Sequence, residues 1–171
     1  MKIRKYDRIF ITGVSGSGKT FLASRISKIL DIKSYDLDNL VFKKNCYDRI
    51  CEKLRDKKLK KIIKRKKWII EGAYSRGWIE SIIKKSNFII IIDINSWLIK
   101  KRILMRTLKR KIGLVKGKKE KFSDFLELIK YAHDYPLKSL PKHREFIDKH
   151  KKEFIILKSK KQINKFLEEL K

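Results

Sequence analysis

The stretch that decides the fold runs from Arg8 to Leu30 and reads RIFITGVSGSGKTFLASRISKIL. A short apolar run, Ile9–Ile11, leads into Gly13–Thr20, which fits the pattern G-x-x-x-x-G-K-[ST]. After this loop, apolar residues recur with the spacing of one helix face: Phe21, Leu22, Ile26, Ile29 and Leu30. The stretch therefore predicts a strand, a phosphate-binding loop (P-loop) and a helix. An ordinary glycine-rich turn would need no lysine–threonine pair at its end.

The residue types of this loop predict a binding site for a nucleoside triphosphate. Its glycines can take backbone angles closed to residues with a Cβ, and successive N–H groups then face an anion above the positive end of a helix. We expect Lys19 to reach the β- and γ-phosphates, as a catalytic group, and the Thr20 hydroxyl to ligate Mg²⁺. The expected binding set for the cofactor ATP is Gly13, Ser15, Gly16, Ser17, Gly18, Lys19, Thr20 and Phe21.

Length and composition fit a single globular domain over residues 1–171, with 42% hydrophobic residues. The longest apolar run, Phe88–Ile92, is far too short to span a bilayer, and no N-terminal signal precedes the first strand. Cys46 and Cys51 lack the spacing of a zinc site. We expect a cytoplasmic monomer with no membrane partner.

The net charge of +28 points toward a different class of partner, because such basic chains often bind nucleic acids. The lysines are nevertheless spread over nearly every predicted element. The densest run, Lys57–Lys67, carries apolar residues between its charges and predicts a helix with a solvated basic face. A polyanion-binding role and a lysine-rich proteome both remain open as explanations. No recognised nucleic-acid module is present, and aromatic residues do not interleave with the basic runs.

Apolar runs and helical spacings alternate along the whole chain. Strands are expected at Arg8–Thr12, Ser34–Tyr35, Trp68–Ile70, Asn87–Asp93 and Phe154–Leu157. The helices expected after the first one are Asp48–Arg65, Trp78–Lys84, Trp97–Lys111, Phe122–Tyr135, one after Pro141, and Gln162–Leu170. Pro136 should stop the helix before it, and Gly113–Lys121 should be a loop that closes over a ligand. This alternation predicts a three-layer α/β P-loop NTPase fold, with about five parallel strands and helices on both faces.

Several motifs together resemble the adenylate-kinase-like family of small P-loop kinases. They are the P-loop, Tyr35–Asp38 (YDLD), Trp68–Arg76 (WIIEGAYSR) and the strand Phe88–Asp93. The closest resemblance is to the adenylate-kinase-related proteins labelled "DNA topology modulation protein", over nearly the whole chain. The resemblance implies Mg²⁺–ATP-dependent phosphoryl transfer to a small acceptor: a nucleoside, a nucleotide or another hydroxyl-bearing metabolite. It also implies a helical lid at about residues 100–145.

The resemblance assigns roles to two aspartates after the second strand. They are similar to the D-x-D of shikimate-kinase-like members, in which one carboxylate orients the acceptor hydroxyl and the other supports Mg²⁺. We expect Asp38 in the first role and Asp36 in the second. Two residues apart on an extended strand, they should face the same side. The alternative for Asp38 is a helix N-cap, because Asn39–Val41 follows it.

Glu71 is similar to the acidic residue after the third strand that holds water on Mg²⁺ in nucleoside monophosphate kinases. The proline of that motif is absent here and the arginine, Arg76, sits one place later, so Arg76 contacts either an acceptor phosphate or solvent.

Arg102, Arg106 and Arg110 are four residues apart and so share a helix face. They resemble the lid arginines that stack on adenine and clamp the transferring phosphoryl group, a task that suits a planar guanidinium. Their alternative is a solvated basic face.

Other polar and aromatic residues are assigned structural roles. Asp93 ends the fourth strand and is expected to be structural, the three histidines to lie on helix surfaces, and the three tryptophans to pack in the core. A second function also stays open: a nucleic-acid-binding protein regulated by ATP. It rests on the net charge and on the basic stretches Lys57–Lys67 and Lys100–Lys121.

Overall fold

The structure is a computed structural model, which describes residues 6–42, 49–112, 114 and 122–170. Five strands form one parallel sheet in the order β2-β3-β1-β4-β5. Their bounds are β1 (Arg8–Gly13), β2 (Ser34–Asp36), β3 (Trp68–Gly72), β4 (Phe88–Ile92) and β5 (Phe154–Leu157). Every residue of β4 is buried, as expected for an apolar strand covered on both faces. The expected five-stranded parallel sheet is confirmed.

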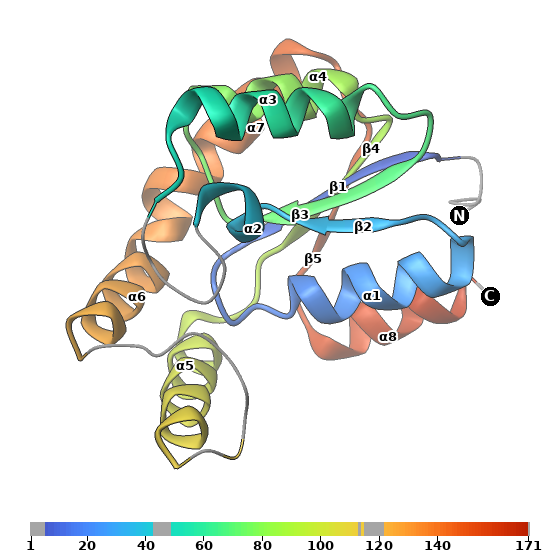
Figure 1. Ribbon diagram of the computed structural model, residues 1–171. Coiled ribbons are helices and arrows are strands. Elements are labelled where there is room, and N and C mark those ends of the chain that lie inside the picture. Colours follow the sequence, from blue (N-terminus) through green and yellow to red (C-terminus); the bar gives the residue numbers. More distant parts are fainter. Residues whose placement is uncertain (1–5, 43–48, 113, 115–121, 171) are drawn as a thin grey trace.

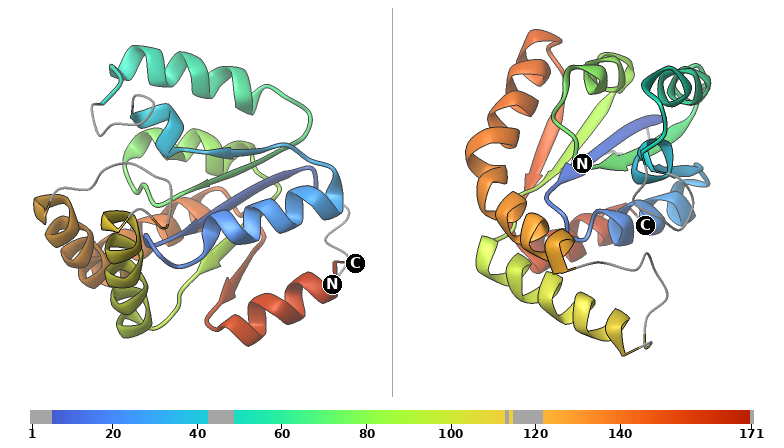
Figure 2. Two further views of the ribbon diagram at one scale, coloured as in Figure 1. Left: turned by 60° about the horizontal axis from the view of Figure 1, so that its bottom comes forward. Right: turned by 60° about the vertical axis from the view of Figure 1, so that its left-hand side comes forward.

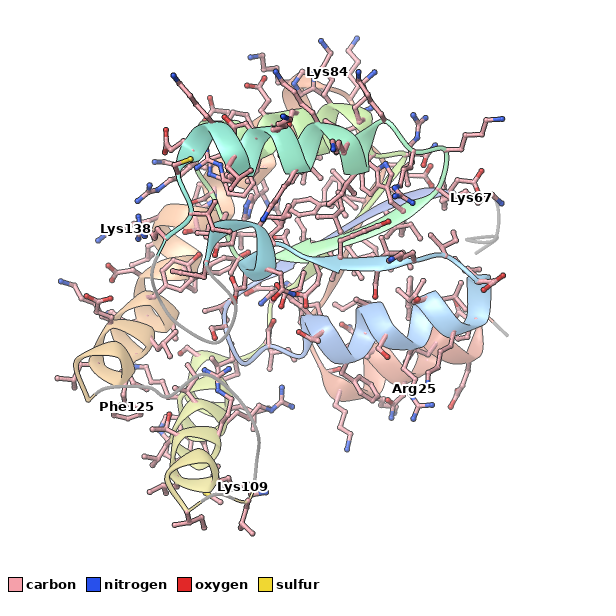
Figure 3. All side chains as sticks on the ribbon, in the orientation of Figure 1. Arg25, Lys67, Lys84, Lys109, Phe125 and Lys138 are labelled. Atoms are coloured by element: carbon pink, nitrogen blue, oxygen red, sulfur yellow. The ribbon has the colours of Figure 1, made fainter. Side chains whose placement is uncertain are left out.

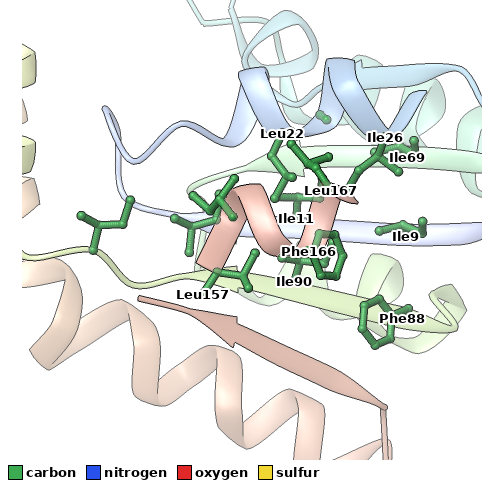
Figure 4. Close-up of a cluster of buried hydrophobic side chains, with 14 of the residues drawn as sticks. Ile9, Ile11, Leu22, Ile26, Ile69, Phe88, Ile90, Leu157, Phe166 and Leu167 are labelled. Carbon is green, nitrogen blue, oxygen red and sulfur yellow. The ribbon is translucent and has the colours of Figure 1, made fainter. Parts of the chain in front are cut away.

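Helices cover both faces of this sheet (Figures 1 and 2). α1 (Lys19–Leu30) and α8 (Lys160–Glu168) lie on one face, and α3 (Glu52–Ile63), α4 (Glu80–Lys85) and α7 (Leu140–Lys149) on the other. Side chains of β1 alternate between the two layers: Ile9 and Ile11 pack toward α1 and α8, whereas Phe10 packs toward the other helices. Figure 4 shows the first of these two clusters. The three-layer architecture is confirmed.

The remaining helical elements lie mainly around the carboxyl ends of the strands. They are α2 (Asp38–Val41), the 3₁₀ turn η2 (Gly77–Ile79), α5 (Ser96–Lys111), α6 (Phe122–Asp134) and the π-helical turn η3 (Tyr135–Ser139). α5 and α6 project together beyond the sheet (Figure 1). Most of the expected lid loop Gly113–Lys121, the side chain of Arg110, Met1–Lys5 and Cys46 lie outside the described residues.

Two expectations about helices and core are wrong. Pro136 does not stop the chain of helices: α6 passes through η3 into α7, and the Leu140 N–H donates to the Tyr135 carbonyl five residues back. Pro136 cannot donate a hydrogen bond to the preceding turn, and its ring would crowd a carbonyl of that turn in an α-helix; the wider π-turn relieves this crowding while the helical path continues. Trp97 is 71% exposed, whereas Trp68 is fully buried. Within the described residues no helix is long and apolar enough to cross a membrane.

Candidate active site

The P-loop joins β1 to α1 and depends on glycine at two kinds of position. A Cβ on Gly13 would lie 2.6 Å from the Ile92 carbonyl oxygen of the neighbouring strand, so no larger residue fits there. Gly18 has a left-handed φ of 100°, and no described atom lies within 4 Å of where its Cβ would be. The loop therefore combines a tight exit from β1 with free space directly before the N-terminus of α1. That space suits a phosphate group.

Lys19 is the electrostatic centre of the site. Only 9% of the residue is exposed, and its Nζ donates to the Val14 carbonyl oxygen at 3.0 Å. Burial lowers the pKa of the Lys19 ammonium, while Glu71, Asp38 and Asp36 oppose that shift, in that order of strength. The structure therefore brings three carboxylates from two segments of the chain, Asp36–Asp38 and the end of β3, close to one buried lysine.

Thr20 and Glu71 form the closest side-chain pair of the site. The Thr20 hydroxyl donates to Glu71 Oε1 at 2.6 Å, across 51 residues of sequence. Glu71 is 3% exposed, and burial raises its pKa against the opposing charge of Lys19. Among the described residues no three His, Cys, Asp or Glu side chains gather to hold a metal ion. A hydroxyl and a carboxylate still fit Mg²⁺, which takes few protein ligands and completes its shell with phosphate and water.

Asp36 and Asp38 are arranged differently from the expectation. β2 ends at Asp36 and α2 begins at Asp38, so the two do not share an extended strand. Asp36 Oδ1 instead accepts the Asp38 N–H at 2.8 Å, which fixes the turn between the strand and the helix. The N-cap alternative for Asp38 is wrong, because Leu37 occupies that position. Both carboxylates nevertheless act on Lys19.

Asp38 has a partner to which the sequence pattern assigned no role. The Tyr74 hydroxyl donates to Asp38 Oδ1 at 2.7 Å. Burial, followed by the negative charge of Asp38, raises the pKa of the Tyr74 phenol, so the phenol stays protonated and remains a donor. Tyr74 belongs to the stretch Trp68–Arg76, so the motif pointed to the segment and not to this contact.

A buried polar cluster lies behind Tyr74. His143 is fully buried, its Nε2 lies 2.7 Å from the Tyr74 carbonyl oxygen, and its Nδ1 lies 3.3 Å from the Tyr135 hydroxyl. The Tyr135 hydroxyl also lies 3.3 Å from the Thr12 hydroxyl of β1. Burial lowers the pKa of His143, and because a carbonyl can only accept, Nε2 carries the proton. The expectation that the histidines lie on helix surfaces is wrong for His143 and confirmed for the exposed His133.

α5 packs against the P-loop. Arg102 Nη1 lies 3.4 Å from the carbonyl oxygens of both Gly16 and Ser17, and a Cβ on Gly16 would lie 3.2 Å from Ile103. The charge of Arg106, one helical turn further along α5, lowers the pKa of Lys19 slightly. The structure therefore brings Arg102 to the P-loop.

Three other expected residues lie outside this constellation. The Phe21 ring is exposed and stacks under the Arg25 guanidinium at 5.4 Å. Arg76 is exposed at the start of η2. The Asp93 N–H donates to the Leu157 carbonyl oxygen, a backbone contact that does not involve its carboxylate, so the structural role of this residue stays a prediction.

Comparison with known proteins bears on the fold. No protein-family model matches the chain, and a search of curated proteins found no match. Shikimate kinase from Bacteroides thetaiotaomicron superposes with a TM-score of 0.60 at 16% identity, over 96% of each chain. Shikimate kinase from Acinetobacter baumannii, in complex with shikimate, gives 0.59 at 15% identity, over 98% of this chain and 92% of that one. A sugar kinase from a Janibacter species gives 0.50 at 15% identity, over 95% and 88%. The chain therefore has the fold of small P-loop kinases, and the adenylate-kinase-like subgroup remains a prediction.

Proposed function

We propose that this protein is a Mg²⁺–ATP-dependent kinase that phosphorylates a hydroxyl group of a small acceptor. The observation that carries the proposal is the convergence of Glu71, Asp36 and Asp38 on Lys19 at the carboxyl edge of the sheet. Ligands of open α/β sheets bind at this edge. A P-loop alone would fit any nucleotide hydrolase, whereas additional carboxylates beside it provide a place for a second substrate.

The P-loop binds the triphosphate in this proposal. Its backbone N–H groups and the N-terminus of α1 hold the phosphate oxygens, and Lys19 leaves the Val14 carbonyl to contact the terminal phosphates. Thr20 and Glu71 hold Mg²⁺, which neutralises charge on the transferring phosphoryl group.

Asp38 orients the acceptor. Its Oδ1 is occupied by the Tyr74 hydroxyl, which fixes the carboxylate and leaves Oδ2 for the acceptor hydroxyl. The acceptor oxygen bonds to the γ-phosphorus, the bond from that phosphorus to the bridging oxygen breaks, and ADP leaves. The hydroxyl proton passes to Asp38. Such a transfer needs positioning and charge neutralisation more than a strong base, which an aspartate can supply.

Arg102 and Arg106 supply the remaining positive charge. Arg102 lies against the P-loop carbonyls, and the charge of Arg106 acts on Lys19. A small movement of α5 would transfer the Arg102 guanidinium from backbone oxygens to phosphate oxygens, which it can bind with two parallel hydrogen bonds.

The test is ADP release from Mg²⁺–ATP in the presence of a panel of nucleosides, nucleoside monophosphates and small hydroxylated metabolites. We expect one class of small acceptor to stimulate release, with one phosphorylated product formed per ADP. The Lys19→Ala variant is the negative control. ADP release that no acceptor changes would contradict the proposal and leave an ATPase.

A further inference from the structure

Away from the P-loop, the described surface carries two depressions lined by lysine. The first, of about 500 Å³, lies at the amino ends of β1, β4 and β5. Five basic side chains and one carboxylate line it, together with Ser86 and Asn87: Arg8, Lys84, Lys85, Lys151, Lys152 and Glu153. These residues come from three segments that are far apart in the sequence, so the fold brings their charges together.

The second depression, of about 480 Å³, runs along α3. Its basic residues are five exposed lysines: Lys53, Lys57, Lys60, Lys61 and Lys64. Each residue of an α-helix advances about 100° around the helix axis, so the five lysines lie within a sector of about 100°. With a rise of about 1.5 Å per residue, they form one stripe roughly 16 Å long. The one carboxylate of the lining, Asp56, is already bound to Arg55 at 2.8 Å.

In the described part of the chain, none of the lysines in either depression forms an ion pair with a carboxylate. Burial, and then the neighbouring charge of Arg8, lower the pKa of Lys152. The like charges in the first depression therefore repel one another, which costs electrostatic free energy. An anionic ligand would remove that cost.

Both depressions are associated with the face of the sheet covered by α3, α4 and α7. Figure 3 shows Lys84 on this side of the molecule and Arg25 of α1 on the opposite side. No aromatic or apolar side chain lines either depression, which disfavours both base stacking and insertion into lipid. The α3 stripe is also too long for a single small phosphate ester. Phosphates of one strand of a duplex recur about every 3.4 Å along the axis, so the stripe spans about five of them.

We propose that these two depressions together bind the phosphodiester backbone of a nucleic acid, without regard to base sequence. The first depression lies at the amino ends of the strands and the second along α3, and neither shares a residue with the proposed kinase site. Binding should therefore be strongly salt-dependent and insensitive to sequence. It should also leave the affinity for Mg²⁺–ATP unchanged.

The experiment measures fluorescence anisotropy of a labelled mixed-sequence duplex between about 50 and 200 mM salt. The surface variant is Lys57→Gln, Lys60→Gln, Lys64→Gln, and a second variant carries Lys84→Gln, Lys85→Gln, Lys151→Gln. The charge-matched control is Lys28→Gln, Lys161→Gln, Lys165→Gln, three exposed lysines on α1 and α8. All three proteins lose the same formal charge, so only position distinguishes them.

We expect each surface variant to bind roughly a hundredfold more weakly at 0.1 M salt and to lose about 3 from the slope of log affinity against log salt. The control should lose less than about 1 from that slope. All three should bind Mg²⁺–ATP as the wild type does, so a failure here is separate from a failure of the proposed kinase activity.

Three results would overturn the proposal. Equal losses in the control and the surface variants would make the net charge responsible and not this surface. Tripolyphosphate that binds as tightly as the duplex would make the depressions sites for small anions. Binding to phosphatidylglycerol vesicles without binding to the duplex would make the partner an anionic membrane surface.

Discussion

The two ends of the sheet use lysine in opposite settings. At the carboxyl edge, Lys19 is buried, bonded to a carbonyl and surrounded by three carboxylates. At the amino edge, Lys84 and Lys85 are exposed and form no ion pair within the described residues. Burial lowers the pKa of both Lys19 and Lys152, but carboxylates oppose the shift at Lys19, whereas the charge of Arg8 adds to it at Lys152.

This contrast shows why a net charge of +28 predicts so little by itself. In the proposed kinase, a lysine among carboxylates serves one phosphoryl group, and its removal should cost the whole function. On the proposed nucleic-acid surface, a lysine among lysines should contribute one increment to the binding of many phosphates. Single substitutions should therefore have large effects at the carboxyl edge and small effects at the amino edge.

The largest expected effect is that of Lys19→Ala. It removes the only point charge inside the P-loop, so phosphoryl transfer should fall by roughly 10³-fold or more, with weaker ATP binding. The measurements are ADP release and the affinity for a fluorescent ATP analogue. Lys28→Ala is the matched control, an exposed lysine on the same helix that should keep wild-type values. Full activity of Lys19→Ala would disprove the P-loop assignment.

The next effect is that of Asp38→Asn, which keeps the shape of the side chain and removes its negative charge. Transfer to the acceptor should fall by roughly 10²-fold or more, while ATP affinity stays nearly intact. Tyr74→Phe is the companion variant: it removes the hydrogen bond to Asp38 and should lower transfer less, because the carboxylate remains. An equal loss of ATP affinity in Asp38→Asn would make Asp38 a metal-site or folding residue.

Local sequence patterns predicted most of the fold. The strand Ile9–Ile11, the P-loop and the apolar run Phe88–Ile92 are contiguous signals, and each lies where it was expected. The Pro136 expectation failed because the rule that proline ends a helix assumes α-helical geometry, whereas the chain here takes a π-turn. The helix expected from Asp48 begins only at Glu52.

Several residues expected at the site do lie beside the P-loop, but the sequence did not predict their contacts with one another. Thr20 and Glu71 were both expected near Mg²⁺, yet their direct hydrogen bond depends on the pairing of β1 with β3. The contact between Asp38 and Tyr74 links a turn after β2 to a loop after β3, and no periodicity encodes it. His143 was misassigned because a polar residue on an amphipathic helix is ordinarily exposed.

A third prediction concerns the pH dependence of stability that arises from His143, which is buried behind Tyr74. Burial holds the pKa of His143 below its ordinary value of 6.5, so the unfolded chain binds this proton more readily than the folded one. Stability should therefore be fully present above pH 6.5 and fall as the pH drops through the folded pKa, by at most about 1.4 kcal/mol per pH unit. The measurement is the urea midpoint between about pH 7.5 and pH 5.

The variant His143→Gln tests this assignment, since an amide can still donate to the Tyr74 carbonyl but does not titrate in this range. It should flatten the part of the pH dependence that His143 contributes. His133→Gln, at an exposed histidine, should leave the dependence as in the wild type. The prediction fails if the two variants behave alike.

The smallest expected effects are those of single lysines in the two depressions. Lys60→Gln removes one charge from a crowded cationic stripe, so the free energy of unfolding should change by less than about 0.5 kcal/mol and, if it changes, should rise. Lys149 on α7 is the informative contrast, because its Nζ lies 2.8 Å from Glu80 Oε1, and Lys149→Gln should lower stability. Urea unfolding of the two variants at low salt measures the difference, which added salt should reduce in both. If Lys60→Gln destabilised the protein as much as Lys149→Gln, the stripe would be a paired structural feature, and the contrast between the two ends of the sheet would no longer hold.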